Sequence, residues 1–150
     1  MEKAVWPFFI LEKNMIEYMM NHQDGTIVYQ TYDITIHKHS LIYTVNKLCM
    51  EHLCTYDGYL KSVQKHHHFS ELIPIYLCET LQLIPIKRYR AYDNCYINYA
   101  SIESYHQIEN EIEIVFISGR KLYIKMSLYS FGKQLEKLKK IRNTKVKHFH

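Results

Sequence analysis

The chain has 150 residues, of which 47% are hydrophobic and only 4 are Gly and 3 Pro, so a disordered or collagen-like chain is excluded and one domain is expected. The net charge of +4 is uneven, because residues 1–75 carry 6 Lys or Arg against 8 Asp or Glu, whereas residues 76–150 carry 13 against 7. The basic C-terminal half predicts an acidic partner, nucleic acid first.

Neither a membrane span nor a disulfide framework is indicated. No apolar run reaches the roughly 20 residues that cross a bilayer, and the N-terminus lacks the pattern of a signal peptide, so we expect a cytoplasmic protein without a membrane partner. The cysteines form no CxxC pair, which argues against a zinc ribbon or a thioredoxin-type motif. They are Cys49, Cys54, Cys78 and Cys95, and we expect them to be small buried hydrophobes.

The first forty residues predict short strands. The dipeptide Asp24-Gly25 predicts a hairpin turn between the second and third of them, because Gly tolerates the positive φ that such turns require. The four apolar or β-branched runs are Phe8–Leu11, Met15–Met20, Thr26–Tyr32 and Ile34–His37.

The spacing of apolar residues changes after Ser40. From Leu41 to Leu53 they recur at helical spacing, which predicts one amphipathic helix of about three turns. Ser40 or Thr44 could cap its start, and Gly58 is near its expected end. Residues 60–71 are polar and aperiodic, so we expect a loop or a frayed helix end there.

Strand patterns return in the second half of the chain. Residues 87–94 interrupt them and predict a long exposed hairpin loop, and Ser118-Gly119 predicts a tight turn. The predicted strands are Leu72–Leu77, Leu81–Ile86, Cys95–Tyr99, Ile112–Ile117 and Lys121–Lys125.

A C-terminal helix follows from Ser127. One apolar stripe runs from Leu128 to Ile141, and a second stripe carries lysine. We therefore expect an α+β fold in which antiparallel β-sheets pack with a central amphipathic helix and a C-terminal basic helix. Residues 1–143 form the domain in this prediction, and residues 144–150 form a flexible basic tail.

Three basic segments supply the candidate DNA contacts, because cations that neutralise phosphates release condensed counterions. They are the loop residues Lys87, Arg88 and Arg90, the hairpin residues Arg120, Lys121 and Lys125, and the helix residues Lys133, Lys137 and Lys140. Arginine in a protruding loop suits a narrow A·T-rich minor groove. A basic helix face that is only solvated is the plain alternative. Tyrosines such as Tyr89 and Tyr92 leave open the binding of single strands by stacking.

The sequence contains residues that can bind metals or act as nucleophiles, but not in the patterns that metal sites or catalytic sites require. His66, His67 and His68 are adjacent, and no ligand pattern accompanies them, so we expect a solvated loop and no metal or other cofactor. Cys54 near His52 and Cys95 near Asp93 lack a third group or an oxyanion hole, which favours structural cysteines and argues against an enzyme.

The chain resembles the ComK family of competence transcription factors over about residues 40–142. The similarity is clearest in a hairpin and the helix that follows it, at Ile114, Phe116, Gly119, Leu122, Ser127, Phe131 and Gln134. Upstream, it extends over Tyr56-Asp57-Gly58, Pro74-Ile75, Leu81–Pro85 and Cys95–Ile102.

This resemblance implies an activator of DNA-uptake genes that binds paired A·T-rich sites on double-stranded DNA, largely through the minor groove. It also implies a nucleoid-associated homo-oligomer that works with RNA polymerase and is controlled by an adaptor and a Clp protease. Departures from the family pattern include Tyr59, Tyr96 and the run Pro85-Ile86-Lys87-Arg88, and the helix is followed by only a short segment. An auxiliary protein that acts through mixed oligomers with a fuller family member is therefore the alternative.

Overall fold

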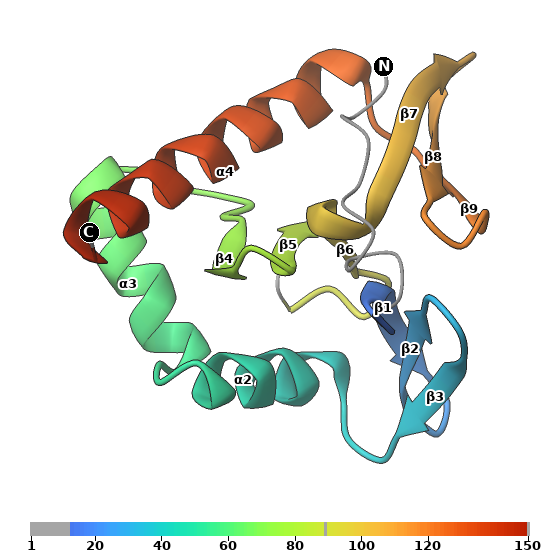
Figure 1. Cartoon of the computed structure of the whole chain (residues 1–150), viewed down its shortest axis with the longest axis horizontal. Coiled ribbons are helices and arrows are strands. Elements are labelled where there is room, and N and C mark those ends of the chain that lie inside the picture. Colours follow the sequence, from blue (N-terminus) through green and yellow to red (C-terminus); the bar gives the residue numbers. More distant parts are fainter. Residues whose placement is uncertain (1–12, 89, 150) are drawn as a thin grey trace.

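Antiparallel β-sheets and α-helices build the protein, as the computed structural model shows for residues 13–88 and 90–149 (Figure 1). The predicted α+β class is confirmed. The predicted strand Phe8–Leu11 and the loop residue Tyr89 lie outside the described residues. Across the described ranges, no helix combines the length and the apolar character that a membrane crossing requires.

The larger sheet has six strands in the order β3-β2-β1-β6-β5-β4, and every neighbouring pair is antiparallel. The strands are β1 (Ile16–His22), β2 (Gly25–Gln30), β3 (Ile34–His37), β4 (Ile75–Cys78), β5 (Leu81–Pro85) and β6 (Cys95–Asn98). Residues 87–94 connect β5 to β6, so the predicted hairpin loop is confirmed. Both outermost strands, β3 and β4, have only four residues.

The turn at Asp24-Gly25 joins β1 to β2 as predicted. Gly25 has a φ of 138°, which is a conformation that other L-residues rarely adopt. A Cβ atom at this position would lie 1.8 Å from the carbonyl oxygen of His37. Glycine is therefore required here both by backbone conformation and by space.

The second sheet has the order β7-β8-β9 and follows the short helix η1 (Tyr99–Ser101). Its strands are β7 (Ile102–Ile108), β8 (Glu111–Phe116) and β9 (Lys121–Ile124). The predicted turn at Ser118-Gly119 joins β8 to β9, and Gly119 has a φ of 90°. Strand β7 was not predicted.

Two helices, and not one, lie between the sheet strands β3 and β4. Helix α2 (Leu41–Glu51) is the predicted helix, and its cap is Ser40, whose Oγ accepts a hydrogen bond from the Tyr43 amide at 3.4 Å. Helix α3 (Tyr56–His67) replaces the predicted loop. Gly58 lies in its first turn and does not end α2, because the Thr55 hydroxyl accepts a bond from the Gly58 amide at 3.0 Å and caps a new helix.

Helix α4 (Leu128–Phe149) docks on the sheets through its apolar stripe. The fully buried Phe131 ring packs edge-on against Tyr105 of β7, with the ring centroids 5.1 Å apart. The buried amide of Gln134 donates to the carbonyl oxygen of Pro85 in β5 at 3.4 Å. Contacts with both sheets therefore fix the orientation of α4.

The C-terminal residues differ from the prediction of a loose tail, because α4 continues through Phe149. Lys145 gives a reason. Its Nζ donates to the carbonyl oxygen of Tyr76 in β4 at 2.7 Å and lies 5.5 Å from the centroid of the Tyr59 ring. The end of the helix is therefore attached to the outer strand of the six-stranded sheet and to α3.

A buried carboxylate connects the two sheets. Glu17 in β1 is fully buried and accepts from Arg120 Nη1 at 2.5 Å and from the Ser118 hydroxyl at 2.8 Å. Arg120 also donates to the carbonyl oxygen of Gln30 at 2.8 Å, and its guanidinium carbon lies 5.3 Å from the centroid of the Tyr29 ring. The turn between β8 and β9 is thus held against β1 and β2.

Candidate nucleic-acid interface

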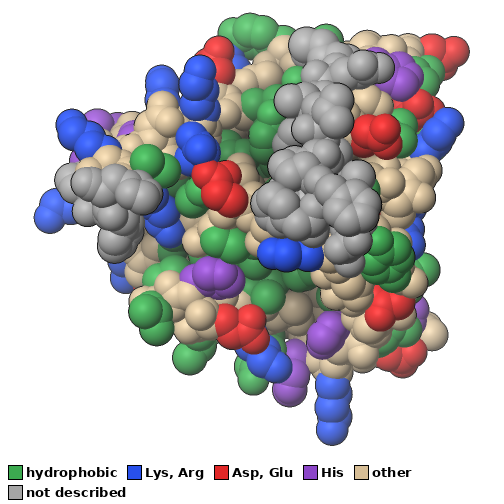
Figure 2. All heavy atoms as spheres, in the orientation of Figure 1, with side chains coloured by type: hydrophobic (Ala, Val, Ile, Leu, Met, Phe, Trp, Pro, Cys, Tyr) green, Lys and Arg blue, Asp and Glu red, His purple; other side chains and the backbone are tan. Residues whose placement is uncertain are grey.

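The exposed side of α4 is basic, as the sequence predicted. We call Lys133, Lys137 and Lys140 the α4 basic face; they follow one another at i, i+4 and i+7, so they share one side of the helix. Figure 2 shows Lys and Arg side chains gathered over α4 at the upper left of the view. Lys133 and Lys140 are exposed, and within the described ranges neither has an ion-pair partner. Lys133 Nζ lies 4.7 Å from the centroid of the exposed Tyr129 ring, a contact that leaves its charge, like that of Lys140, without an acidic partner in the described residues.

Lys137 is more constrained than its two neighbours. Its Nζ donates to the carbonyl oxygen of Glu71 at 2.9 Å and lies 5.7 Å from the centroid of the Phe69 ring. Burial lowers the pKa of the Lys137 ammonium, whereas the Glu71 carboxylate acts in the opposite direction. This lysine therefore anchors the segment between α3 and β4 as well as adding charge.

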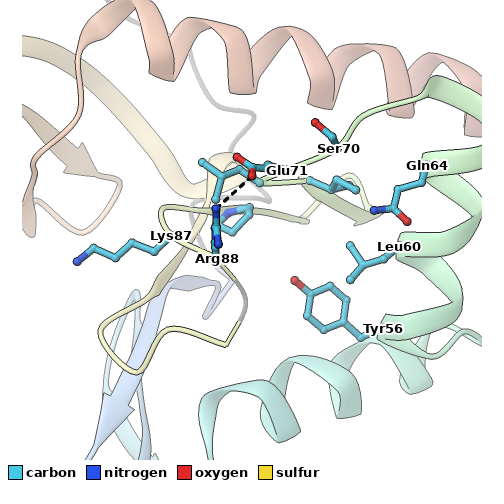
Figure 3. A pocket seen from close by; sticks show the side chains of 10 residues that line it. Tyr56, Leu60, Gln64, Ser70, Glu71, Lys87 and Arg88 are labelled. Atoms are coloured by element: carbon cyan, nitrogen blue, oxygen red, sulfur yellow. Dashed lines mark hydrogen bonds and ion pairs between the residues drawn. The ribbon is translucent and has the colours of Figure 1, made fainter.

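Glu71 links the helix to the basic loop. Its carboxylate accepts from Arg88 Nη2 at 3.4 Å (Figure 3), while its carbonyl oxygen accepts from Lys137 Nζ at 2.9 Å. Two of the three predicted basic segments are thus brought to the same residue. Lys87, the other basic residue of this loop segment, is paired elsewhere: its ammonium group donates a hydrogen bond to the Asp93 carboxylate, and this bond lowers the pKa of the Asp93 carboxyl.

The loop between β5 and β6 is organised by a residue that the sequence analysis did not single out. The Oδ1 atom of the fully buried Asn94 accepts from the amides of Lys87 and Cys95, both at 2.8 Å, and from that of Ile86 at 3.2 Å. Its Nδ2 donates to the carbonyl oxygen of Arg88 at 3.3 Å. One amide side chain therefore holds the base of the loop, so Arg88 projects from an ordered support.

A hollow of about 240 Å³ lies beside this loop (Figure 3). Tyr56, Leu60 and Gln64 of α3 line one side, and Arg88 and Glu71 lie at the other. Pockets for small molecules usually measure roughly 300–1,000 Å³. The hollow is smaller than this range, so the charged rim is the more notable feature of the region.

The third basic segment does not join the other two. Arg120 is committed to Glu17, and Lys121 lies 3.9 Å from a carboxylate oxygen of Glu113 in the neighbouring strand. Lys125 shares a shallow hollow with Glu109 and Glu111. Figure 1 shows β9 on the side of the molecule away from the C-terminal half of α4. Acidic neighbours offset the charge of this hairpin.

His67 of α3 packs against α4, in a segment that the sequence predicted as a loop. His67 Nε2 lies 3.0 Å from the Thr144 hydroxyl of α4, and its ring stacks on Phe69 with the centroids 5.2 Å apart. Burial, followed by His66 and Lys140, lowers the pKa of His67. In the described part of the chain, no group of three or more His, Cys, Asp or Glu side chains is placed to hold a metal ion.

Comparison with known proteins identifies the family. The family described as ComK protein matches residues 8–148. No curated protein and no solved structure matches the chain significantly. Several residues that carry the similarity have structural roles here, since Gly119 forms the β8–β9 turn and Phe131 and Gln134 dock α4. The match covers nearly the whole sequence, so the chain belongs to the ComK family, a family of competence transcription factors and not of enzymes.

Proposed function

We propose that the protein is an activator of DNA-uptake genes that binds double-stranded, A·T-rich DNA through the α4 basic face and the Arg88 loop. The main support is the junction at Glu71, which brings Arg88 and Lys137 together from distant parts of the sequence. Lys133 and Lys140 contact phosphates in this proposal, and Arg88 and the exposed Arg90 enter the minor groove. Binding as an oligomer, contact with RNA polymerase and control by an adaptor and a Clp protease remain proposals that follow from the family.

Removing two exposed lysines from α4 tests the phosphate contacts. We expect Lys133→Ala with Lys140→Ala to weaken binding to all duplexes and to make the slope of log K against log salt less negative by about 1.8, which is about 0.9 for each lost contact. Fluorescence anisotropy with one A·T-rich duplex between 50 and 200 mM salt, roughly the range over which phosphate contacts dominate the affinity, measures this slope.

A charge-matched control separates a specific surface from net charge. Lys121→Ala with Lys125→Ala removes the same two charges from β9 and its end, where acidic side chains already offset them. This control is expected to keep most of the affinity and the slope of the unmodified protein. Equal losses in the two double variants would show that net charge alone drives binding, and an unchanged slope in the α4 variant would refute the proposed face.

Arg88 tests the reading of the minor groove. We expect Arg88→Ala to reduce the preference for A·T-rich over G·C-rich duplexes by at least about fivefold, near the lower end of what one base-reading arginine contributes. Arg142→Ala is the matched control, because Arg142 lies on α4 and pairs with Glu79 at 2.7 Å. Competition titrations with the two duplexes give the ratio. An unchanged preference for A·T-rich duplexes would show that Arg88 does not read the minor groove.

One observation favours the auxiliary alternative. Arg88, Lys87 and Lys121 all have acidic partners within the chain, which lowers the charge available to DNA. A gel shift with A·T-rich duplex, with and without a fuller family member, separates the two functions. A shift only in the presence of that partner would support mixed oligomers, and a shift with the purified protein alone supports direct binding.

A further inference from the structure

The outer strand β3 carries an unusual surface for the edge of a sheet. Ile34 and Ile36 point to the same face and are 52% and 51% exposed. Their neighbours on β2 are Tyr29 and Ile27, which are half-buried. Within residues 13–88 and 90–149, β3 pairs with β2 alone, so its outer side presents unpaired backbone groups next to an apolar strip.

Two other edge strands, β4 and β9, have protection. The β4 edge is covered by α4, since Lys145 Nζ bonds to the Tyr76 carbonyl oxygen at 2.7 Å. The edge strand β9 carries charge in Lys121, and Lys125 follows it. Lysine and covering helices are common ways to prevent unwanted strand pairing. Strand β3 instead presents two isoleucines, which favour pairing.

We propose that β3 is an interface for a second copy of this chain, which adds its own β3 antiparallel with Thr35 opposite Thr35 of the partner copy. The sequence is self-complementary in this register. On one face, Ile34 lies opposite Ile36, while on the other face Asp33, which directly precedes the strand, lies opposite His37. Apolar and acid–imidazole pairs of this kind each stabilise antiparallel strands by roughly 0.2–1 kcal/mol.

Shifted registers are less complementary. A shift by one residue places Ile36 opposite Thr35 and Ile34 opposite His37, because side chains alternate between the faces. Moving the centre to Ile36 places Ile34 opposite Lys38, and moving it to Ile34 places Ile36 opposite Tyr32 and His37 opposite Thr31. Among these registers, the one centred on Thr35 is the one in which both isoleucines of each copy lie opposite an isoleucine of the other.

This pairing does not depend on DNA binding. Pairing through a four-residue strand buries less surface than the roughly 1,200 Å² of a stable interface. We therefore expect free molecules to associate only weakly. Two copies on neighbouring DNA sites would meet at a raised effective concentration, which strengthens a weak contact. The interface is therefore tested without DNA, and its failure would leave the proposed DNA binding untouched.

Disulfide trapping tests both the surface and the register. Opposing residues of an antiparallel pair have Cα atoms roughly 4.5–5.5 Å apart, which a disulfide can bridge. We expect Thr35→Cys to form covalent dimers under mild oxidation at least about tenfold faster than His37→Cys, because two copies of residue 37 would lie roughly 14 Å apart along the strands. Non-reducing gels follow the reaction, and the unmodified protein measures any background from the native cysteines.

Two further samples keep the result decisive. A mixture of Asp33→Cys and His37→Cys proteins should cross-link between the two variants, and Ile34→Lys added to Thr35→Cys should abolish trapping while circular dichroism stays unchanged. Faster trapping by Ile34→Cys or Ile36→Cys than by Thr35→Cys would overturn the register. Equal, slow trapping at all positions would overturn the interface and would indicate that another partner, or none, covers β3.

Discussion

Replacing Arg120 with alanine is expected to lower the free energy of unfolding by about 3–5 kcal/mol, because it leaves a buried carboxylate without its charged partner. Glu17 is fully buried, and Arg120 Nη1 approaches its Oε1 at 2.5 Å. The variant also loses the bond from Arg120 to the Gln30 carbonyl oxygen. Urea unfolding at neutral pH, followed by circular dichroism, measures the change.

Glu17→Gln is the matched control for this prediction. It removes the buried charge but keeps an oxygen that can accept from Ser118 and Arg120, so we expect a smaller loss, about 1–3 kcal/mol. Where Arg120→Ala is still folded, its DNA affinity should keep the salt slope of the unmodified protein. A variant within about 0.5 kcal/mol of the unmodified protein, as for an ordinary surface substitution, would contradict the structural role.

Phe131→Ala is expected to cost about 3–5 kcal/mol, because it removes a large side chain that is fully buried. The Phe131 ring contacts Tyr105 of β7, and its loss opens a cavity beneath the first turns of α4. We expect DNA affinity to fall together with stability, since the α4 basic face is positioned by this contact. Thermal unfolding and anisotropy on the same samples test the two effects.

Tyr129→Ala controls for the change in helix propensity. Tyr129 is an aromatic residue of the same helix, but it is 71% exposed and its ring contacts only the Lys133 ammonium among the described cation–aromatic pairs, so its substitution should alter stability by no more than about 1 kcal/mol. Phe131→Leu keeps most of the buried volume and should cost less than about 1.5 kcal/mol. Similar losses in Phe131→Ala and Tyr129→Ala would mean that α4 is not docked through Phe131.

The parts of the fold that the sequence predicted are those with local signals. Asp24-Gly25 and Ser118-Gly119 mark their turns because glycine supplies the positive φ. Helix α4 was predicted because its apolar residues repeat at helical spacing beside a lysine stripe. Its end was placed too early, because residues 144–149 have little apolar periodicity and depend on the distant carbonyl group of Tyr76.

Helix α3 and strand β7 were missed for a related reason. The buried side of α3 consists of Tyr56, Tyr59 and Val63, and tyrosine and valine also favour strands. Strand β7 buries only Ile102 and Tyr105, so its remaining polar residues show no clear alternation. In both elements, contacts with distant residues outweigh a weak local pattern.

The candidate site was predicted in part. The lysines of α4 and the arginine loop are visible in the sequence because charge clusters there. Glu71, which joins them, and Asn94, which orders the loop, are single polar residues whose roles depend on partners far away in the chain. Likewise, Glu17 and Arg120 are 103 positions apart, so no local pattern marks Arg120 as structural.

The bond between Lys145 and Tyr76 gives α4 a second task. The helix that carries the lysines also covers β4, the edge strand of the six-stranded sheet, with which strands of other molecules could otherwise pair. A protein truncated just before Leu128 would thus lose the lysines of α4. It would also expose the edge of β4, which could then pair with other molecules and promote aggregation. The position of the lysines and the protection of the sheet edge therefore depend on the same helix, so a substitution that loosens α4 affects both.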